Sequence, residues 1–415
     1  MTQCKHILTM VFHLLLILLT VLAINTPNYS CTTAVISGRA TPDGRPILWK
    51  HRDSSTFQNK LRYFDDGIYP YIGLINANDS TGAEIWAGTN SAGFSIMNSA
   101  SYNLKKNETE LADQEGKIMN MALQQCKTIR DFEALLDSSS HKRGVEANFG
   151  VIDAFGGAAY YETDDSSYAK FDANDPATSP FGYLIRTNFS FTRNIDEGYG
   201  YIRYQTTETL FYQAYAEKKL THEFILRIAD RNLYHSLTGT DLRKPPYVLS
   251  SNENDFTYFE DFINRYTSVS TIVVHGVAPG ESVDLNTFWT ILGFPLTSIA
   301  VPVWVAAGNE LPTELIAPDS KPAPLCRKSL RLKLRCFPIS RGSGTSYINR
   351  AVLFNQIGTG IQQILPEIEK GIFKIVNPKL IEWRLNGFKK TDALKMYKQF
   401  DEYIPRSFNR EFGFK

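Results

Sequence analysis

Cys31, Thr32 and Thr33 stand directly after a hydrophobic N-terminal leader, and this placement is the chain's clearest indication of chemistry. A cut immediately before Cys31 would leave a thiol and a free α-amino group on one residue. Free α-amino groups titrate at about pH 7.7 to 8.0 and thiols at about pH 8.5. The amine can therefore accept the thiol proton, directly or through one water, so this nucleophile needs no histidine.

The leader over residues 1–30 has the parts of a secretory signal peptide: a positive charge, an apolar run over 7–24 and then small residues. Its uninterrupted part is shorter than the roughly 20 apolar residues of a membrane-spanning helix. We therefore expect removal of the leader and, for a bacterial source, a periplasmic or secreted protein without a stable membrane span. Signal peptidase cuts either at Ser30 or at Ala23, in which case the residues up to Ser30 form a short propeptide that is removed later.

Composition narrows the class of protein. About 385 residues follow the leader, enough for one large domain or two ordinary ones. A hydrophobic share of 43% and a formal net charge of +1 argue against a disordered chain and against a nucleic-acid-binding surface. The His, Cys, Asp and Glu residues have no metal-ligand spacing, and no phosphate-binding or nucleophile-elbow motif is present, so we expect neither metal nor cofactor.

Three further cysteines follow Cys31. Cys326 and Cys336 lie ten residues apart in a basic stretch, and in an exported protein they are candidates for a disulfide. Cys126 falls on the apolar face of a helical pattern and is expected to pack in the core.

The part of the chain after Cys31 has short apolar and β-branched runs separated by turn residues, as is typical of strands. The first two runs form a hairpin about an Asp43-Gly44 turn. Counting back from this turn predicts that Cys31 lies opposite Thr56, with the end of the second strand beside it. Strict alternation puts Asp53 on the other face of the sheet from Cys31, unless a bulge changes the register.

Further strands and helices alternate along the chain. Strands are expected at 47–50, 84–87, 93–98, 148–154, 158–163 and 182–187, and helices at 117–137, 206–232 and 357–403. Pro366 and Pro378 should kink or divide the last helix. The pattern predicts an α+β domain in which helices cover mainly antiparallel sheets. The composition changes after about residue 311, so we expect a main domain over 31–311 and, over 312–415, a Pro-rich and basic connection with helices that pack on the same domain.

The opening Cys31-Thr32-Thr33, followed by the hairpin and Lys50-His51-Arg52-Asp53, resembles the N-terminal-nucleophile (Ntn) amide hydrolases of the choloylglycine hydrolase, penicillin V acylase and penicillin acyltransferase type. The resemblance implies a four-layer αββα sandwich with Cys31 as catalytic nucleophile and Asp53 as the residue that holds its amino group. Lys50 replaces the family's arginine and lacks the planar fork for bidentate contacts, so Arg52 is a second candidate for substrate binding.

Two asparagines and one arginine extend the resemblance. The segment from Gly88 to Phe94 is similar to the family's Asn-Glu-Lys-Gly-Leu segment, after which an asparagine or tyrosine helps to line the oxyanion site, and Asn98 takes that place here. Asn90 and Gly93 within this segment are expected to form an ordinary turn. Asn188, in Arg186-Thr187-Asn188, takes the place of the asparagine that donates to the oxyanion. It also begins a glycosylation sequon. Arg203 is the candidate for the family's last catalytic arginine, with Arg193 as its competitor.

The resemblance implies hydrolysis of a linear amide C–N bond in a small N-acyl substrate, through a Cys31 thioester, and an even-numbered homo-oligomer would suit the family. Acyltransferase and dipeptidase activities would use the same nucleophile. A Cys–His hydrolase with His51 as base is a further alternative. A secreted binding protein with a structural or lipid-bearing Cys31 is the non-catalytic one, although the residues before Cys31 lack the lipoprotein pattern.

Overall fold

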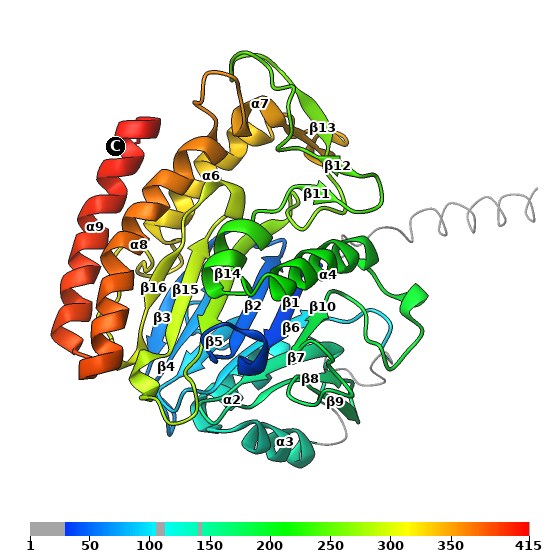
Figure 1. Cartoon of the computed structure of the whole chain (residues 1–415), viewed down its shortest axis with the longest axis vertical. Helices are drawn as coiled ribbons and strands as arrows, with labels where there is room; N and C mark the ends of the chain where they lie inside the picture. The colour runs from blue at the N-terminus through cyan, green and yellow to red at the C-terminus, as the bar shows by residue number, and fades with distance from the viewer. Residues whose placement is uncertain (1–29, 105–112, 140–142, 415) are drawn as a thin grey trace, which may run out of the picture.

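Two stacked β-sheets form the centre of the protein (Figure 1). The computed structural model describes residues 30–104, 113–139 and 143–414. The expected signal peptide and both of its cut sites lie outside these residues, except for Ser30. All strand pairs of the two sheets are antiparallel.

The first sheet contains the hairpin that begins beside Cys31. In spatial order its six described strands are β10 (Tyr183–Arg186), β1 (Thr32–Ile36), β2 (Ile47–Asp53), β14 (Ser268–His275), β15 (Thr287–Leu292) and β16 (Val301–Val303). β1 and β2 therefore lie inside the sheet, with a neighbour on each side.

The second sheet follows sequence order. Its seven described strands are β3 (Asn59–Phe64), β4 (Tyr71–Asn76), β5 (Ala87–Asn90), β6 (Ser95–Ala100), β7 (Ala147–Ile152), β8 (Ala158–Thr163) and β9 (Tyr168–Asp172). Asn90 and Gly93 form the turn between β5 and β6, where Gly93 has a φ of 83°.

The sheets pack face to face and exchange polar contacts across the interface. Tyr160 Oη on β8 donates to Thr33 Oγ1 on β1 at 2.8 Å. Gly150 on β7 permits this close approach, because a Cβ there would lie 2.9 Å from Val35 and closer still to Met97. The interface is thus tightly packed, and strand side chains that point into it are held in fixed positions.

Helices cover both outer faces. On the seven-stranded sheet, Phe132 packs edge-on against Phe149 and Tyr161. On the six-stranded sheet, Trp289 of β15 stacks on Phe373 at 4.7 Å. The helices on the seven-stranded sheet are α2 (Glu115–Gln125) and α3 (Ile129–Ser138). Those on the six-stranded sheet include α4 (Tyr201–Ala216), α6 (Pro324–Cys336), α8 (Ile361–Asn386) and α9 (Lys390–Phe412). The layers are therefore αββα, and the predicted α+β fold class is confirmed.

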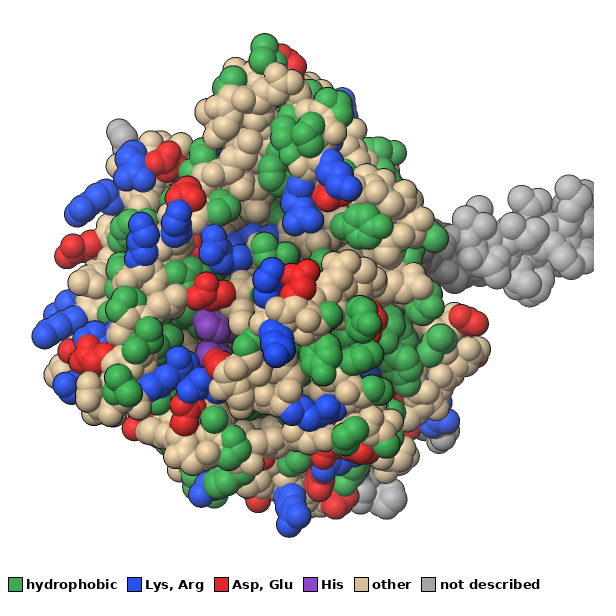
Figure 2. Space-filling view, in the orientation of Figure 1, with side chains coloured by type: hydrophobic (Ala, Val, Ile, Leu, Met, Phe, Trp, Pro, Cys, Tyr) green, Lys and Arg blue, Asp and Glu red, His purple; other side chains and the backbone are tan. Residues whose placement is uncertain are grey.

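Shorter elements connect these layers. They are α5 (His222–Phe224), α7 (Arg350–Leu353) and the two-stranded pairs of β11 (Tyr234–His235) with β12 (Thr240–Asp241) and of β13 (Phe256–Tyr258) with β17 (Tyr347–Asn349). In the described part of the chain, no helix combines the length and apolar character that crossing a membrane requires. Basic and acidic side chains are interspersed on the face shown in Figure 2, in keeping with the small net charge.

Several predicted elements need correction. The strand expected at 84–87 is β5 at Ala87–Asn90, and β3, β4, β9, β14, β15 and β16 were not predicted. β14 and β15 are buried on both faces, so they lack the alternation that marks half-exposed strands. The single helix expected at 117–137 is two helices, which Cys126 and the capping box of Thr128 separate.

The C-terminal helices also differ from expectation. Pro366 and Pro378 both lie inside α8, and neither ends it. Pro378 is on the exposed side, while Val376 and Leu380 are buried and hold the helix on the core. The helical segment is divided instead at Gly387, which follows the last residue of α8 and has a φ of 84°. The domain boundary expected near residue 311 stays a prediction; α6 and α8 both contact the six-stranded sheet or its connections.

The proposed disulfide between Cys326 and Cys336 is wrong. Both cysteines are free and buried in the single helix α6. Ten residues of α-helix span about 15 Å, whereas bridged cysteines have Cα atoms at most about 7 Å apart.

Candidate active site

Cys31 lies at the start of β1 and is 7% exposed. Thr33 pairs with Lys50 on β2, and this register sets Cys31 beside Arg52. The prediction that Cys31 lies opposite Thr56 is therefore wrong. A short 3-10 helix in the connection moves the centre of the hairpin towards β1. Lys50 and Arg52 share one face with the thiol because residues of equal parity along a strand point the same way.

Asp53, at the end of β2, has a fully buried side chain. Its Oδ2 accepts hydrogen bonds from Arg265 Nε at 3.1 Å and from Arg265 Nη2, and its Oδ1 accepts one from Ser268 Oγ at 2.7 Å. Arg265 Nη2 also donates to the Ser30 carbonyl at 2.8 Å. A single guanidinium therefore joins the Asp53 carboxylate to the peptide bond that precedes Cys31.

The Asp53–Arg265 pair is strongly coupled. Burial alone would lower the pKa of Arg265, but the charge and hydrogen bonds of Asp53 outweigh burial and raise that pKa above its ordinary value. A β-bulge in β14, between Ser268 and Ser270, interrupts the pairing with β2 next to Asp53. The bulge gives Ser268 the position from which it reaches Asp53 Oδ1.

His51 lies on the face of β2 that carries Asp53. Its Nδ1 is 2.8 Å from Asp230 Oδ1, and its Nε2 is 2.9 Å from Ser268 Oγ. Asp230, His51 and Ser268 are thus aligned as in a serine hydrolase. Ser268, however, is buried and donates its hydrogen to Asp53. The hydrogen bonds of Asp230, His51 and Ser268 therefore hold Asp53 in place. Because both ring nitrogens of His51 already have partners, His51 is not a base for Cys31.

Lys50 points between the sheets. Its Nζ donates to Asn98 Oδ1 at 2.6 Å and to the Trp86 carbonyl at 2.7 Å. Burial lowers the pKa of Lys50 to about 7, while negative charge on Cys31 acts in the opposite direction. Lys50 and Asn98 are thus hydrogen-bonded to each other close to the Cys31 thiol, as expected if both belong to one site.

Arg52 packs with its guanidinium carbon 4.6 Å from the centre of the Trp86 ring. Its Nη2 donates to Asn76 Oδ1 at 2.9 Å. Its Nη1 is buried without a hydrogen-bond partner among the described residues, as is Trp86 Nε1. Unpartnered buried donors cost free energy, so these two are candidates for contacts to a substrate.

Arg203, in the first turn of α4, holds the other side of Cys31. Nη1 donates to the Cys31 carbonyl at 2.7 Å and to Thr32 Oγ1 at 2.8 Å, and Nη2 donates to Asn188 Oδ1 at 3.0 Å. Gly200 has a φ of 86°, and a Cβ there would collide with Nη2. Arg193 is not a competitor, because it is 49% exposed and lies 3.6 Å from Asp164.

Asn188 is completely buried. Its Nδ2 donates to the Ala100 carbonyl at 2.8 Å, which uses one of its two amide hydrogens. Its backbone forms a bridge with Tyr199. Full burial excludes a glycan on Asn188 in the folded protein. Glu162 supports the following loop, because it accepts hydrogen bonds from the amides of Phe191 and Thr192, each at 2.9 Å.

No protein-family model matches the chain, and no curated protein is detectably similar in sequence. Solved structures give low-identity matches. The chain is similar to a Caenorhabditis elegans ortholog of N-acylethanolamine-hydrolyzing acid amidase, with 13% identity and a TM-score of 0.36 over 59% of this chain and 92% of that chain. It is similar to a variant of conjugated bile acid hydrolase from Clostridium perfringens, with 11% identity and a TM-score of 0.40 over 68% and 95% of the two chains.

A third match is penicillin V acylase from Agrobacterium tumefaciens, with 11% identity and a TM-score of 0.34 over 66% of this chain and 86% of that chain. Bile acid hydrolases and penicillin V acylases are the types of enzyme that the sequence resembles. Because the identities and TM-scores are this low, the chemistry proposed for this chain rests on the geometry of its own site.

The structure brings all the sequence-predicted site residues to one region; their catalytic and binding roles stay predictions. Those residues are Cys31, Lys50, Arg52, Asp53, Asn98, Asn188 and Arg203. Arg265, Ser268 and Trp86 were not predicted; they belong to other strands or connections. Glu115 was not predicted either; it is a buried carboxyl whose negative charge favours the charged form of Lys50, and burial raises its own pKa to about 7. No local pattern marks these four residues.

Proposed function

We propose that the protein hydrolyses a linear amide C–N bond of a small N-acyl substrate, with Cys31 as N-terminal nucleophile. The observation that carries this proposal is the Arg265 bridge from Asp53 to the Ser30 carbonyl. It supports the proposal because a chain that starts at Cys31 would have its α-amino group beside this buried carboxylate and guanidinium.

In the proposed reaction, the Cys31 thiol gives its proton to the α-amine while sulfur attacks the amide carbonyl. Asp53 orients the amine, and the nearby positive charge of Arg265 favours the neutral amine that accepts protons. The tetrahedral intermediate collapses as the C–N bond breaks, and the leaving amine takes the proton. A thioester remains. Water attacks it, passes a proton to the α-amine, and releases the acid and the free thiol.

The oxyanion of each intermediate needs donors in a dry site. The second amide hydrogen of Asn188 is the first candidate, and Arg203 fixes the orientation of that amide by donating to Oδ1. On the Asn98 side, Lys50 Nζ supplies a cation that holds Asn98 by its Oδ1. Arg52 Nη1 and Trp86 Nε1 are the proposed donors to the rest of the substrate.

The proposal requires that residues 1–30 be removed. We infer export to the periplasm or outside the cell, with removal by signal peptidase at Ser30, or at Ala23 with a later second cut. If signal peptidase cuts at Ala23, the peptide bond between Ser30 and Cys31 must be cut later. Arg265 supports nucleophilic attack on this bond, because its hydrogen bond polarises the Ser30 carbonyl.

Two experiments test this function. Intact-mass measurement of active protein should give a chain that starts at Cys31 and carries no lipid. Cys31→Ala should abolish turnover of a panel of N-acyl amides that includes N-acyl amino acids and penicillin V. Turnover by that variant, or activity in a chain whose Cys31 remains in an internal peptide bond, would rule out the mechanism.

The same panel separates the alternative activities. An acyltransferase would use the same residues and pass the thioester to an amine, so its products change when an acceptor amine is added. A dipeptidase would cleave dipeptides in preference to N-acyl amides. A protein that binds these amides without cleaving them would point to the non-catalytic alternative.

A further inference from the structure

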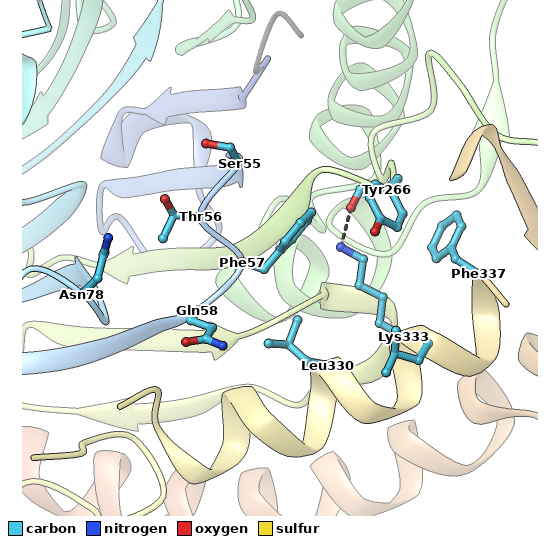
Figure 3. A pocket seen from close by; sticks show the side chains of 10 residues that line it. Ser55, Thr56, Phe57, Gln58, Asn78, Tyr266, Leu330, Lys333 and Phe337 are labelled. Carbon is cyan, nitrogen blue, oxygen red and sulfur yellow. Dashed lines mark hydrogen bonds between the residues drawn. The ribbon is translucent and has the colours of Figure 1, made fainter. Parts of the chain in front are cut away.

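A cavity of about 510 Å³ lies at the end of the sheet that carries Asp53 (Figure 3). The residues that line it include Ser55, Phe57, Tyr266, Leu330, Lys333 and Phe337. The lining comes from the segment after β2, the connection before β14 and helix α6. Its volume suits a small organic molecule.

Backbone pairing ties this cavity to the candidate active site. The Ser54 amide, next after Asp53, donates to the Thr267 carbonyl at 2.9 Å. Ser55 and Tyr266 enter the cavity wall directly from this pair. The wall on the other side belongs to α6, in the C-terminal segment after residue 311.

The cavity contains one buried cation. Lys333 is 4% exposed, and its Nζ lies 4.0 Å from the centre of the Phe57 ring and 4.5 Å from that of Tyr266. Figure 3 shows the ammonium between these rings, with a hydrogen bond to the Tyr266 carbonyl. Among the described residues, no carboxylate lies within ion-pair distance of Lys333. Burial lowers the pKa of Lys333 to about 7.

An ammonium group has three hydrogens, and the Tyr266 carbonyl uses one of them. The aromatic faces stabilise the cation, but rings cannot accept its remaining hydrogens as a carboxylate would. The charge of Asp53 acts on this ammonium only from beyond ion-pair distance, and a buried charge without a contacting counter-ion is costly. A ligand that brings one negative charge would therefore gain affinity from Lys333.

We propose that this cavity binds a carboxylate with an apolar body, and that Lys333 is the residue that recognises its charge. Phe57, Leu330 and Phe337 supply apolar wall for the body of the ligand. One buried cation matches one carboxylate. A strongly hydrated phosphate dianion would meet one cation and a lining surface that is mostly apolar.

The test compares decanoate with decanol by isothermal titration calorimetry on the full protein. Decanoate should bind at least tenfold more tightly than decanol. Lys333→Met, which keeps an unbranched side chain but removes the terminal ammonium, should weaken decanoate binding at least tenfold and leave decanol binding unchanged. Lys370→Met is the matched control, because Lys370 is a half-exposed lysine on α8 whose loss should change neither affinity.

A second measurement needs no variant. Burial lowers the pKa of Lys333 to about 7, and a bound carboxylate favours the charged ammonium. Decanoate binding should therefore take up more protons at pH 9 than at pH 6, measured as a dependence of the binding enthalpy on the ionisation enthalpy of the buffer. The proposal is wrong if decanoate binds no better than decanol, if Lys333→Met keeps full decanoate affinity, or if no proton is taken up. None of these measurements depends on turnover, so they stand apart from the test of amide hydrolysis.

Discussion

The buried pair of Asp53 and Arg265 gives the sharpest prediction on stability. The Asp53 side chain is fully buried, and that of Arg265 is 13% exposed. Removing one partner of such a pair leaves a buried charge without compensation, which costs about 3 to 5 kcal/mol. Asp53→Asn keeps the shape of the side chain and should therefore lower the free energy of unfolding by this amount.

The double variant Asp53→Asn with Arg265→Met removes both charges. Its free energy of unfolding should return to within about 1 to 2 kcal/mol of the wild type, because no buried charge is left unpaired. The two substitutions should thus be non-additive by at least about 2 kcal/mol in a double-mutant cycle. Urea unfolding followed by circular dichroism measures all four proteins.

Turnover should behave differently from stability. The double variant should remain inactive although it is folded, because the residue proposed to orient the Cys31 amine is still missing. Glu367→Gln is the control: Glu367 forms a solvent-exposed pair with Lys370, and its loss should cost at most about 1 kcal/mol. The claim that an unpaired buried charge destabilises the protein is wrong if Asp53→Asn lowers the free energy of unfolding no more than this control does. It is also wrong if the double variant is less stable than both single variants.

Three further predictions concern other residues of the two sites. Arg203→Lys should lower kcat/KM at least about tenfold, because lysine lacks the fork that spans Cys31 and Asn188; unchanged kinetics would refute this role. Asn188→Ala should lower kcat about 100-fold to 1000-fold if its amide donates to the oxyanion, and an effect confined to KM would contradict that. Burial places the pKa of Lys333 at about 7, below its ordinary value of 10.5, so the unfolded chain binds more protons between these values. The site's contribution to the free energy of unfolding should therefore rise with pH above 7, by at most about 1.4 kcal/mol per pH unit; urea unfolding at pH 7, 8 and 9 should show a smaller rise for Lys333→Met.

The hairpin explains why part of the site was predictable. Cys31 and Asp53 lie on adjacent strands joined by a short connection, so their proximity follows from local pattern and turn residues. The exact register of the hairpin could not be predicted in this way, because the connection contains a 3-10 helix that a count from the Asp43-Gly44 turn does not include. Asn98 and Asn188 were placed by resemblance, and the structure brings both to the same region.

The order of strands in the two sheets could not be predicted from the sequence. β14 lies next to β2 although more than 200 residues separate them, and this pairing delivers Arg265 and Ser268 to Asp53. Fully buried strands such as β14 have no solvent-exposed face, so the alternation that identifies half-exposed strands is missing. The path of α6 over the end of the sheet, which buries Lys333, likewise depends on long-range packing.

The sequence by itself determined the reactive groups and where along the chain they stand: a cysteine behind a hydrophobic N-terminal segment, a following aspartate, and the strand and helix types around them. These follow from residue chemistry and from periodicities of a few residues. Only the tertiary structure decided the partners of each group, that His51 serves Asp53 rather than Cys31, and that Cys326 and Cys336 stay apart in one helix. Hydrogen bonds and burial depend on distances between segments far apart in the chain, and no local pattern encodes those distances.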